Sequence, residues 1–65
     1  MMWTEIRKVP DLMLAEMWKE YFEGEGVPTQ ILPVTGEAPV RELVEYRVLV
    51  PTDKKHIIDE ILRTL

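Results

Sequence analysis

The chain has 65 residues, of which 46% are hydrophobic and 31% charged, with a formal net charge of −4 and no cysteine. These values predict one small globular domain, residues 1–65, and exclude an intrinsically disordered or a disulfide-stapled chain. The lack of cysteine also excludes thiolate metal sites and cysteine nucleophiles. No apolar run approaches the roughly 18 residues of a membrane span, and the N-terminus lacks a signal-peptide pattern, so we expect a cytoplasmic protein with no membrane partner.

The negative charge is concentrated in one part of the chain. Residues 11–26 hold five acidic residues and one lysine, whereas the acidic and basic residues of the remainder balance. An acidic surface repels phosphate groups, which argues against nucleic acid and anionic membranes as partners. We interpret the acidic stretch as the solvated face of a helix, with a recognition surface as the alternative.

A strand and a helix are predicted to open the domain. Residues 3–9 mix apolar and polar side chains, which is typical of a strand at a sheet edge. Pro10 ends this strand, and Asp11 is a good N-cap for a helix over residues 12–25. Gly26 is expected to end the helix in the left-handed conformation. The apolar residues of the helix recur at the spacing of one buried face: Leu14, Ala15, Trp18, Tyr21 and Phe22.

Two methionines lie beside this predicted buried face. Met13 and Met17 are about one turn apart, and one helix of a small domain need not cover them. On the opposite face, Lys19 is placed to pair with Glu23. We therefore expect the two methionines to add uncovered apolar surface.

Two further strands follow the helix. Residues 27–34 contain Pro28 and Pro33, which limit the hydrogen-bond ladder and place this strand at the other edge of the sheet. Residues 46–51, Tyr-Arg-Val-Leu-Val-Pro, give the clearest strand signal and are expected at the centre of the sheet. Side chains alternate along this strand, with Tyr46, Val48 and Val50 on one face and Arg47 and Leu49 on the other.

The connection over residues 35–45 is long for a hairpin. Gly36 and Pro39 predict a turn in its first half. Residues 40–44 fit either a helical turn or an early extension of the third strand.

The last helix is expected to begin with Thr52 or Asp53 as N-cap and to run to the end of the chain. On its exposed side, Asp59 is placed to pair with both Lys55 and Arg63. Its apolar stripe comprises Ile57, Ile58, Ile61, Leu62 and Leu65.

The predicted order of elements, β-α-β-β-α, indicates an α+β fold. A helix separates the first two strands, so we expect them to be parallel, with the third strand antiparallel between them and both helices on one face. This is a ferredoxin-like split β-α-β unit with a three-stranded sheet of order 1-3-2. The missing fourth strand leaves the edge of residues 3–9 unpaired. We therefore expect a homodimer, through this edge or through the open sheet face that carries Leu49.

The sequence offers few residues for catalysis. Serine and asparagine are lacking as well as cysteine, and the single histidine, His56, falls opposite the apolar stripe of the last helix. A lone exposed histidine is a poor general base. No zinc, calcium or nucleotide-loop motif occurs. We therefore expect a protein without enzyme activity, metal site or cofactor.

Three stretches, taken in their order and spacing, resemble a known family: Ala15-Glu16-Met17-Trp18-Lys19, Glu25-Gly26-Val27-Pro28 and Arg47-Val48-Leu49-Val50-Pro51. The family is a small bacterial one of proposed signal-transducing proteins, whose fold is related to that of the nitrogen-regulatory PII proteins. The resemblance covers nearly the whole chain. It implies the β-α-β-β-α fold, a regulatory role, and ligand and partner contacts in the connection between the second and third strands.

These observations predict a non-enzymatic regulatory or signal-transducing module that binds another protein. The alternative is a sensor of a small anionic metabolite, held near the connection between the second and third strands or between subunits. The candidate contact residues are Gly36, Glu37, Arg41 and Arg47.

Overall fold

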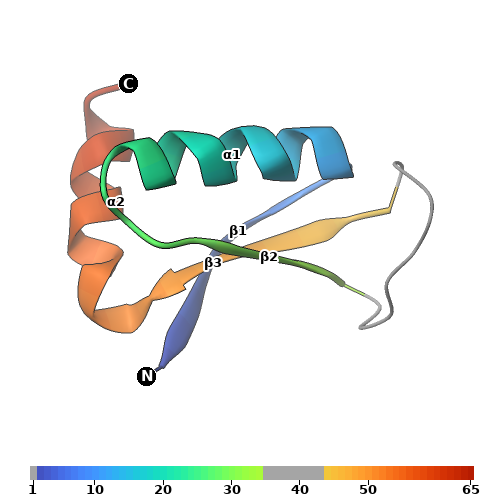
Figure 1. Ribbon diagram of the computed structural model, residues 1–65, viewed down its shortest axis with the longest axis horizontal. Helices are drawn as coiled ribbons and strands as arrows, with labels where there is room; N and C mark the ends of the chain where they lie inside the picture. Colours follow the sequence, from blue (N-terminus) through green and yellow to red (C-terminus); the bar gives the residue numbers. More distant parts are fainter. Residues whose placement is uncertain (1, 35–43) are drawn as a thin grey trace.

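The computed structural model describes residues 2–34 and 44–65. In chain order, its elements are β1 (Trp3–Val9), α1 (Leu12–Gly24), β2 (Gln30–Pro33), β3 (Tyr46–Pro51), the 3-10 turn η1 (Thr52–Lys54) and α2 (Lys55–Arg63). The predicted α+β order is therefore confirmed, with η1 added before the last helix (Figure 1). The choice between a helical turn and an extended chain at residues 40–43 lies outside the described residues.

β3 is the central strand of the sheet, whose order is β1-β3-β2. It pairs antiparallel with both neighbours, so β1 and β2 run parallel to each other, as predicted. Tyr46, Val48 and Val50 belong to the buried core. The alternation predicted for this strand is thus confirmed on its core face.

A β-bulge in β1 accounts for the irregular sequence of that strand. The register against β3 shifts between Glu5 and Arg7, so Ile6 is the extra residue. Regular alternation would place Ile6 and Val9 on opposite faces of the sheet. With the bulge, both side chains pack in the core, and Arg7 lies on the same face beneath α1.

Both ends of α1 are closed by the predicted caps. Oδ1 of Asp11 accepts a hydrogen bond from the backbone N–H of Leu14 at 2.9 Å. At the other end, Gly26 has a φ of 88°, in the left-handed region. The N–H of Val27 donates to the carbonyl of Phe22 at 3.0 Å, as in a Schellman motif. The chain therefore turns sharply from the helix towards the sheet.

β2 is shorter than the strand predicted over residues 27–34. Val27 is part of the helix cap and is buried in the core. Oγ1 of the buried Thr29 donates to the carbonyl of Val27 at 3.1 Å. These local contacts hold residues 27–29 outside the ladder, so pairing with β3 begins at Gln30. Its place at a sheet edge agrees with the prediction.

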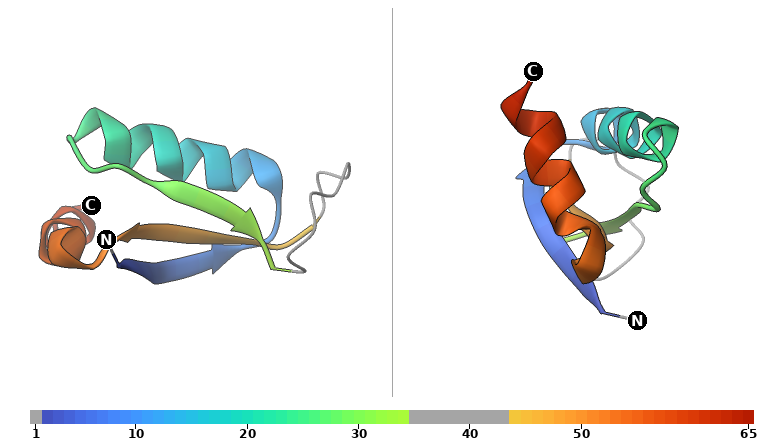
Figure 2. Two further views of the ribbon diagram at one scale, coloured as in Figure 1. Left: turned by 60° about the horizontal axis from the view of Figure 1, so that its bottom comes forward. Right: turned by 90° about the vertical axis from the view of Figure 1, so that its left-hand side faces the viewer.

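The core lies between α1 and one face of the sheet (Figure 2). α1 contributes two fully buried side chains, Ala15 and Phe22, and β3 contributes its alternate residues. The complete buried cluster comprises Val9, Ala15, Phe22, Val27, Tyr46, Val48, Val50 and Ile58.

The position of α2 corrects the prediction that both helices lie on one face. α1 covers the face of the sheet, whereas α2 lies across the end of the sheet, crosswise to α1 (Figures 1 and 2). It reaches the core through the fully buried Ile58. α2 has only 9 residues and follows β3 after one 3-10 turn. Because this connection is so short, the helix packs where β3 ends instead of folding back beside α1.

The side-chain cap predicted for the last helix is wrong. No side chain caps the N-terminus of η1 or of α2. The hydroxyl of Thr52 instead lies 2.6 Å from that of Thr4, and the N–H of Thr52 donates to the carbonyl of Met2 at 2.9 Å. Thr52 therefore ties the start of β1 to the end of β3.

Two exposed ion pairs lie along α2. Nζ of Lys55 is 3.2 Å from Asp59, as predicted. Arg63 pairs with Glu60 at 3.4 Å instead of with Asp59. Exposed pairs of this kind stabilise a helix by at most about 0.5 kcal/mol.

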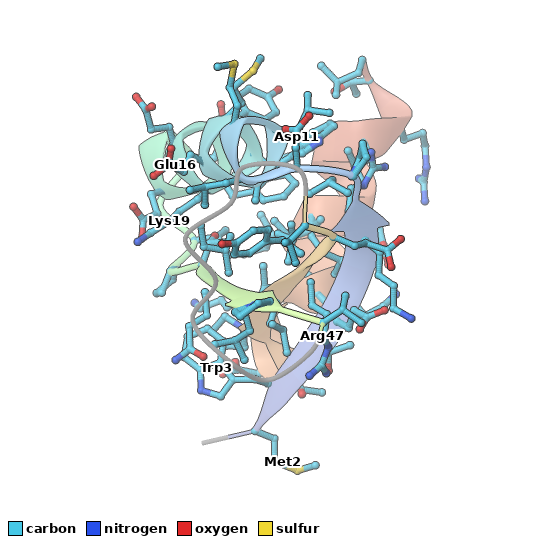
Figure 3. All side chains as sticks on the ribbon, turned by 90° about the vertical axis from the view of Figure 1, so that its right-hand side faces the viewer. Met2, Trp3, Asp11, Glu16, Lys19 and Arg47 are labelled. Carbon is cyan, nitrogen blue, oxygen red and sulfur yellow. The ribbon has the colours of Figure 1, made fainter. Side chains whose placement is uncertain are left out.

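Trp3 and Arg47 lie on the sheet face opposite α1 (Figure 3). Leu49, which we predicted to be uncovered on this face, is only 6% exposed. It occupies the central strand, where its cross-strand partners are Glu5 and Gln30. Side chains from both edge strands therefore enclose it without a covering helix.

Candidate functional site

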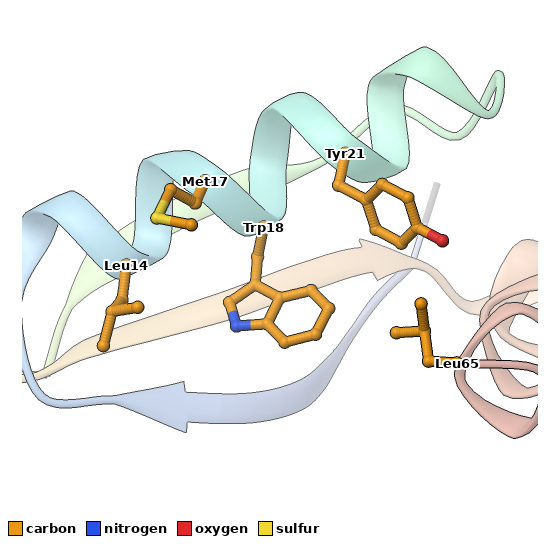
Figure 4. Close-up of a pocket in the computed structure, with 5 residues that line it drawn as sticks. All are labelled: Leu14, Met17, Trp18, Tyr21 and Leu65. Carbon is orange, nitrogen blue, oxygen red and sulfur yellow. The ribbon is translucent and has the colours of Figure 1, made fainter.

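An apolar groove runs along one flank of α1. It has a volume of about 360 Å³ and is lined by Leu14, Met17, Trp18, Tyr21 and Leu65 (Figure 4). The first four residues follow the spacing i, i+3, i+4 and i+7, which places them on one side of the helix. Leu65 follows α2 and faces them across the groove (Figure 4). We call this surface the α1 groove.

The α1 groove is open because α2 does not lie beside α1. The sequence predicts a single buried face for α1, but only Ala15 and Phe22 of that face are fully buried. Leu14 and Trp18 are half-buried, and Tyr21 is exposed, which corrects its predicted place in the core. The apolar face of α1 is thus wider than the surface that the sheet covers.

Stacked aromatic rings form the floor of the α1 groove. The ring of Trp18 stacks on the buried Phe22 at a centroid distance of 5.3 Å and meets Tyr21 edge to face at 6.2 Å. From β1, the guanidinium carbon of Arg7 lies 4.4 Å from the centre of the Trp18 ring. A cation over an aromatic face is a favourable contact of about 0.5–2 kcal/mol. Phe22 and Arg7 therefore both help to fix the Trp18 ring.

Exposed apolar side chains surround the α1 groove. Met17 is 59% exposed, Met13 beside it 63%, and Leu65 on the opposite wall 72%. The uncovered surface predicted for Met13 and Met17 is therefore confirmed. Apolar side chains that gather in one exposed patch, instead of being scattered singly, mark binding surfaces.

The lining of the α1 groove suits apolar contact. Its polar side-chain groups are the hydroxyl of Tyr21 and the indole N–H of Trp18, and no acid, base or thiol lines it. A partner can place aliphatic or aromatic side chains in the groove and direct one or two hydrogen bonds to these groups.

The residues predicted as contacts lie elsewhere. Gly36, Glu37 and Arg41 are outside the described residues. Arg47 lies on the sheet face opposite α1, where its Nε donates to Oε1 of Glu5 at 2.7 Å. Arg47 is therefore paired with a neighbouring glutamate and lies on the other side of the sheet from the α1 groove.

The spacing of apolar residues predicts buried positions for all the groove residues except Met17. The signal that could have found the groove was the width of the apolar face, because Met13 and Met17 extend it beyond what one sheet can cover. The position of Leu65 carried no such signal, because it depends on where α2 packs.

Two further features concern the part of the chain that the structure describes. Residues 2–34 and 44–65 contain no cluster of three or more side chains suited to binding a metal ion. Neither helix in these ranges has the length and apolar character needed to cross a membrane.

Comparison with protein-family models, with curated proteins and with solved structures gave no significant match.

Proposed function

We propose that this chain is a non-enzymatic regulatory module of the bacterial cytoplasm that acts by binding another protein in the α1 groove. The observation that carries the proposal is the exposure of Met17 and Leu65 on opposite walls of an apolar groove. Full burial of one such side chain is favourable by about 1.5–3 kcal/mol. A partner that covers both walls gains this free energy, and the aromatic floor offers it a shaped surface.

The proposal extends to the fold class. The order β1-β3-β2, with α1 connecting the two parallel edge strands, supports a three-stranded version of the ferredoxin-like split β-α-β unit. The crosswise α2 is the departure from that arrangement. The resemblance to the PII-related bacterial family supports a regulatory role over a catalytic one.

The alternative, a sensor of an anionic metabolite, has less support. Its described residue, Arg47, already pairs with Glu5. The Glu5 carboxylate, bound at Nε, already balances the charge of this guanidinium and weakens its attraction for a further anion. The α1 groove, in contrast, has an apolar lining without a cation.

The test compares captured proteins between matched variants. The wild-type chain is immobilised and exposed to an extract of the source organism, and bound proteins are identified by mass spectrometry. The groove variant combines Met17→Ala with Leu65→Ala, and the control combines Met2→Ala with Leu32→Ala. All four side chains are exposed, so both variants should keep the fold, which circular dichroism checks.

We expect the wild type and the control to retain a common protein that the groove variant loses. Identical sets of captured proteins from all three baits would contradict the proposed function.

A further inference from the structure

We infer that the α1 groove binds a protein segment in which an acidic side chain lies next to apolar ones, and that this acid pairs with Arg7. The inference rests on the proposed function, because it names the chemistry of the partner that the groove binds. Two observations carry it: the guanidinium of Arg7 is unpaired, and it contacts the floor of the groove.

Arg7 touches the floor of the α1 groove from the side of the sheet. It belongs to β1, and its guanidinium carbon lies 4.4 Å from the centre of the Trp18 ring. Trp18 in turn lines the groove together with its helix neighbours Leu14 and Tyr21. A group that binds against Trp18 is therefore close to a cation, although the cation itself is not part of the apolar lining.

The charge of Arg7 has no partner among the described residues. Its Nε is buried and has no hydrogen-bond acceptor there. Nη1 and Nη2 also form no hydrogen bond or ion pair in that part of the chain, and neither atom is fully buried. Arg47 and Arg63, in contrast, are each paired with a glutamate. Arg7 therefore has unused N–H donors that a partner can reach.

An unpaired guanidinium on a half-buried side chain calls for a ligand. Burial removes part of the water around Arg7, and the face of the Trp18 ring replaces this solvation only in part. Buried polar groups of native proteins nearly always have a hydrogen-bond partner. A carboxylate supplies the missing negative charge, and its two oxygens fit two N–H groups of one guanidinium. The position of Arg7 thus indicates an acidic residue on the partner.

The glutamates of α1 neither pair with Arg7 nor border the groove. Glu16 and Glu20 are each two residues from Trp18, which is about 200° of rotation in an α-helix, so they point away from it. Figure 3 shows Glu16 and Lys19 on the same side of α1. Both glutamates are exposed, so salt screens their charges over roughly 10 Å. The cation in contact with Trp18 therefore acts on an occupant more strongly than these distant carboxylates do.

The length of the α1 groove suits a segment of a protein. The groove runs from Leu14 to Tyr21, about 10 Å along the axis of α1, and Met17 and Leu65 stand exposed on its two walls. A helix with apolar side chains at i, i+3, i+4 and i+7 covers this length and leaves polar flanks beside the stripe. A glutamate on the flank above β1 then lies next to Arg7. Phosphopeptide sites, in contrast, gather several basic side chains, and the described residues that line this groove include none.

The test uses two synthetic peptides that differ only in the charge beside the apolar stripe. Each has about 18 residues, or roughly five helical turns, with leucines at the stripe positions and lysines on the opposite face for solubility. One peptide has a glutamate on each flank of the stripe, so that one of them faces β1 in either direction of binding. The other has glutamine at both positions. Each peptide carries a dye, and fluorescence anisotropy follows its binding to the full chain.

Matched variants separate the charge of Arg7 from other effects. Arg7→Met removes the guanidinium but keeps an unbranched, flexible side chain against Trp18. Lys8→Met is the control, because it removes an exposed positive charge from the next residue of β1 and changes the net charge equally. Met17→Ala with Leu65→Ala again truncates the groove walls. Circular dichroism checks the fold of every variant.

We expect the wild type to bind the glutamate peptide about threefold to tenfold more tightly than the glutamine peptide. Arg7→Met should reduce this preference to less than about twofold, because the carboxylate loses its donors, whereas Lys8→Met should change it by less than about twofold. The Met17/Leu65 variant should weaken both peptides. If Arg7→Met does not fold, the comparison of the two peptides on the wild type still decides the inference.

Several results would overturn the inference. Equal or weaker binding of the glutamate peptide by the wild type would show that the groove is used but that its partner is not acidic, which leaves the proposed function intact. A full preference for the glutamate peptide in Arg7→Met would place the carboxylate away from this arginine. Failure of both peptides to bind would refute this occupant, while the extract experiment decides the proposed function separately. A dimer in light scattering that dissociates in the Met17/Leu65 variant would assign the groove to a second copy.

Discussion

Gly24 and Gly26 are two residues apart and differ in backbone conformation. Gly24 ends α1, whereas Gly26 has a φ of 88° in the cap that follows it. A Cβ added at either position meets no heavy atom within 4 Å. Substitution of each by alanine therefore tests the backbone alone.

We expect the two alanine substitutions to have opposite signs. Gly26→Ala should destabilise the protein by about 1–2 kcal/mol, because a Cβ is strained in the left-handed region. Gly24→Ala should stabilise it by roughly 0.5–1 kcal/mol, because alanine favours the helix and restricts the unfolded chain. Urea denaturation followed by circular dichroism measures both changes. Equal effects at the two positions would show that the cap does not need its left-handed residue.

Val48 and Val34 allow a matched test of the core. Val48 of β3 is fully buried beneath α1, whereas Val34, after β2, is 39% exposed. Val48→Ala should cost roughly 2–4 kcal/mol, as other large-to-small core substitutions do, and Val34→Ala less than about 1 kcal/mol. Denaturation midpoints give both values, and similar midpoints for the two variants would argue against a central β3.

At the scale of the element, the start of α1 depends on one side chain. Asp11→Ala removes the acceptor for the N–H of Leu14 and should destabilise the protein by about 1 kcal/mol. Asp53→Ala is the control, because Asp53 lies in η1, whose start has no side-chain cap. We expect the control to change stability by less than about 0.5 kcal/mol. A loss as large in the control would mean that charge, and not capping, explains the effect.

α1 carries three surfaces at once. Ala15 and Phe22 face the core, Met17 and Tyr21 face the groove, and the glutamates of the helix are exposed to water. A helix that only supports a sheet needs one apolar stripe and one polar face. The apolar surface of α1 that the core does not need is therefore the feature of its sequence that indicates a binding surface.

At the scale of the whole molecule, the homodimer stays a prediction, and the structure bears on which surface would form it. β1 contains a bulge at Ile6 and an inward-pointing Arg7, and both features blunt a sheet edge. The open sheet face carries Leu32, which is 41% exposed, next to Val34. Of the two surfaces predicted for a dimer interface, the open sheet face is therefore the better candidate.

Light scattering across a dilution series tests this expectation. We expect a dimer that Leu32→Lys dissociates and that Met17→Lys, an exposed apolar-to-lysine change on the other side of the molecule, leaves intact. A dimer that survives Leu32→Lys would favour the β1 edge. A monomer at high micromolar concentration would contradict self-association through either surface.

The local elements of this protein follow from its sequence. The strand at Tyr46–Pro51, the cap at Asp11 and the left-handed Gly26 are each specified by neighbouring residues, and all three are present. The order β1-β3-β2 also follows, because the helix that joins β1 to β2 makes these strands parallel, and the most apolar strand, β3, is favoured at the centre with a neighbour on each side. These features depend on signals within a few residues of the chain and on how the length and type of a connection orient the strands that it joins.

The groove and its surroundings were decided by tertiary structure. Periodicity shows that Trp18 and Tyr21 are apolar positions of a helix, but it does not show which element covers them. Ile6 reaches the core only because β1 slips against β3, and Leu65 faces α1 only because α2 packs across the end of the sheet. Each of these contacts joins residues far apart in the chain, and the relative placement of packed elements determines which apolar side chains stay exposed.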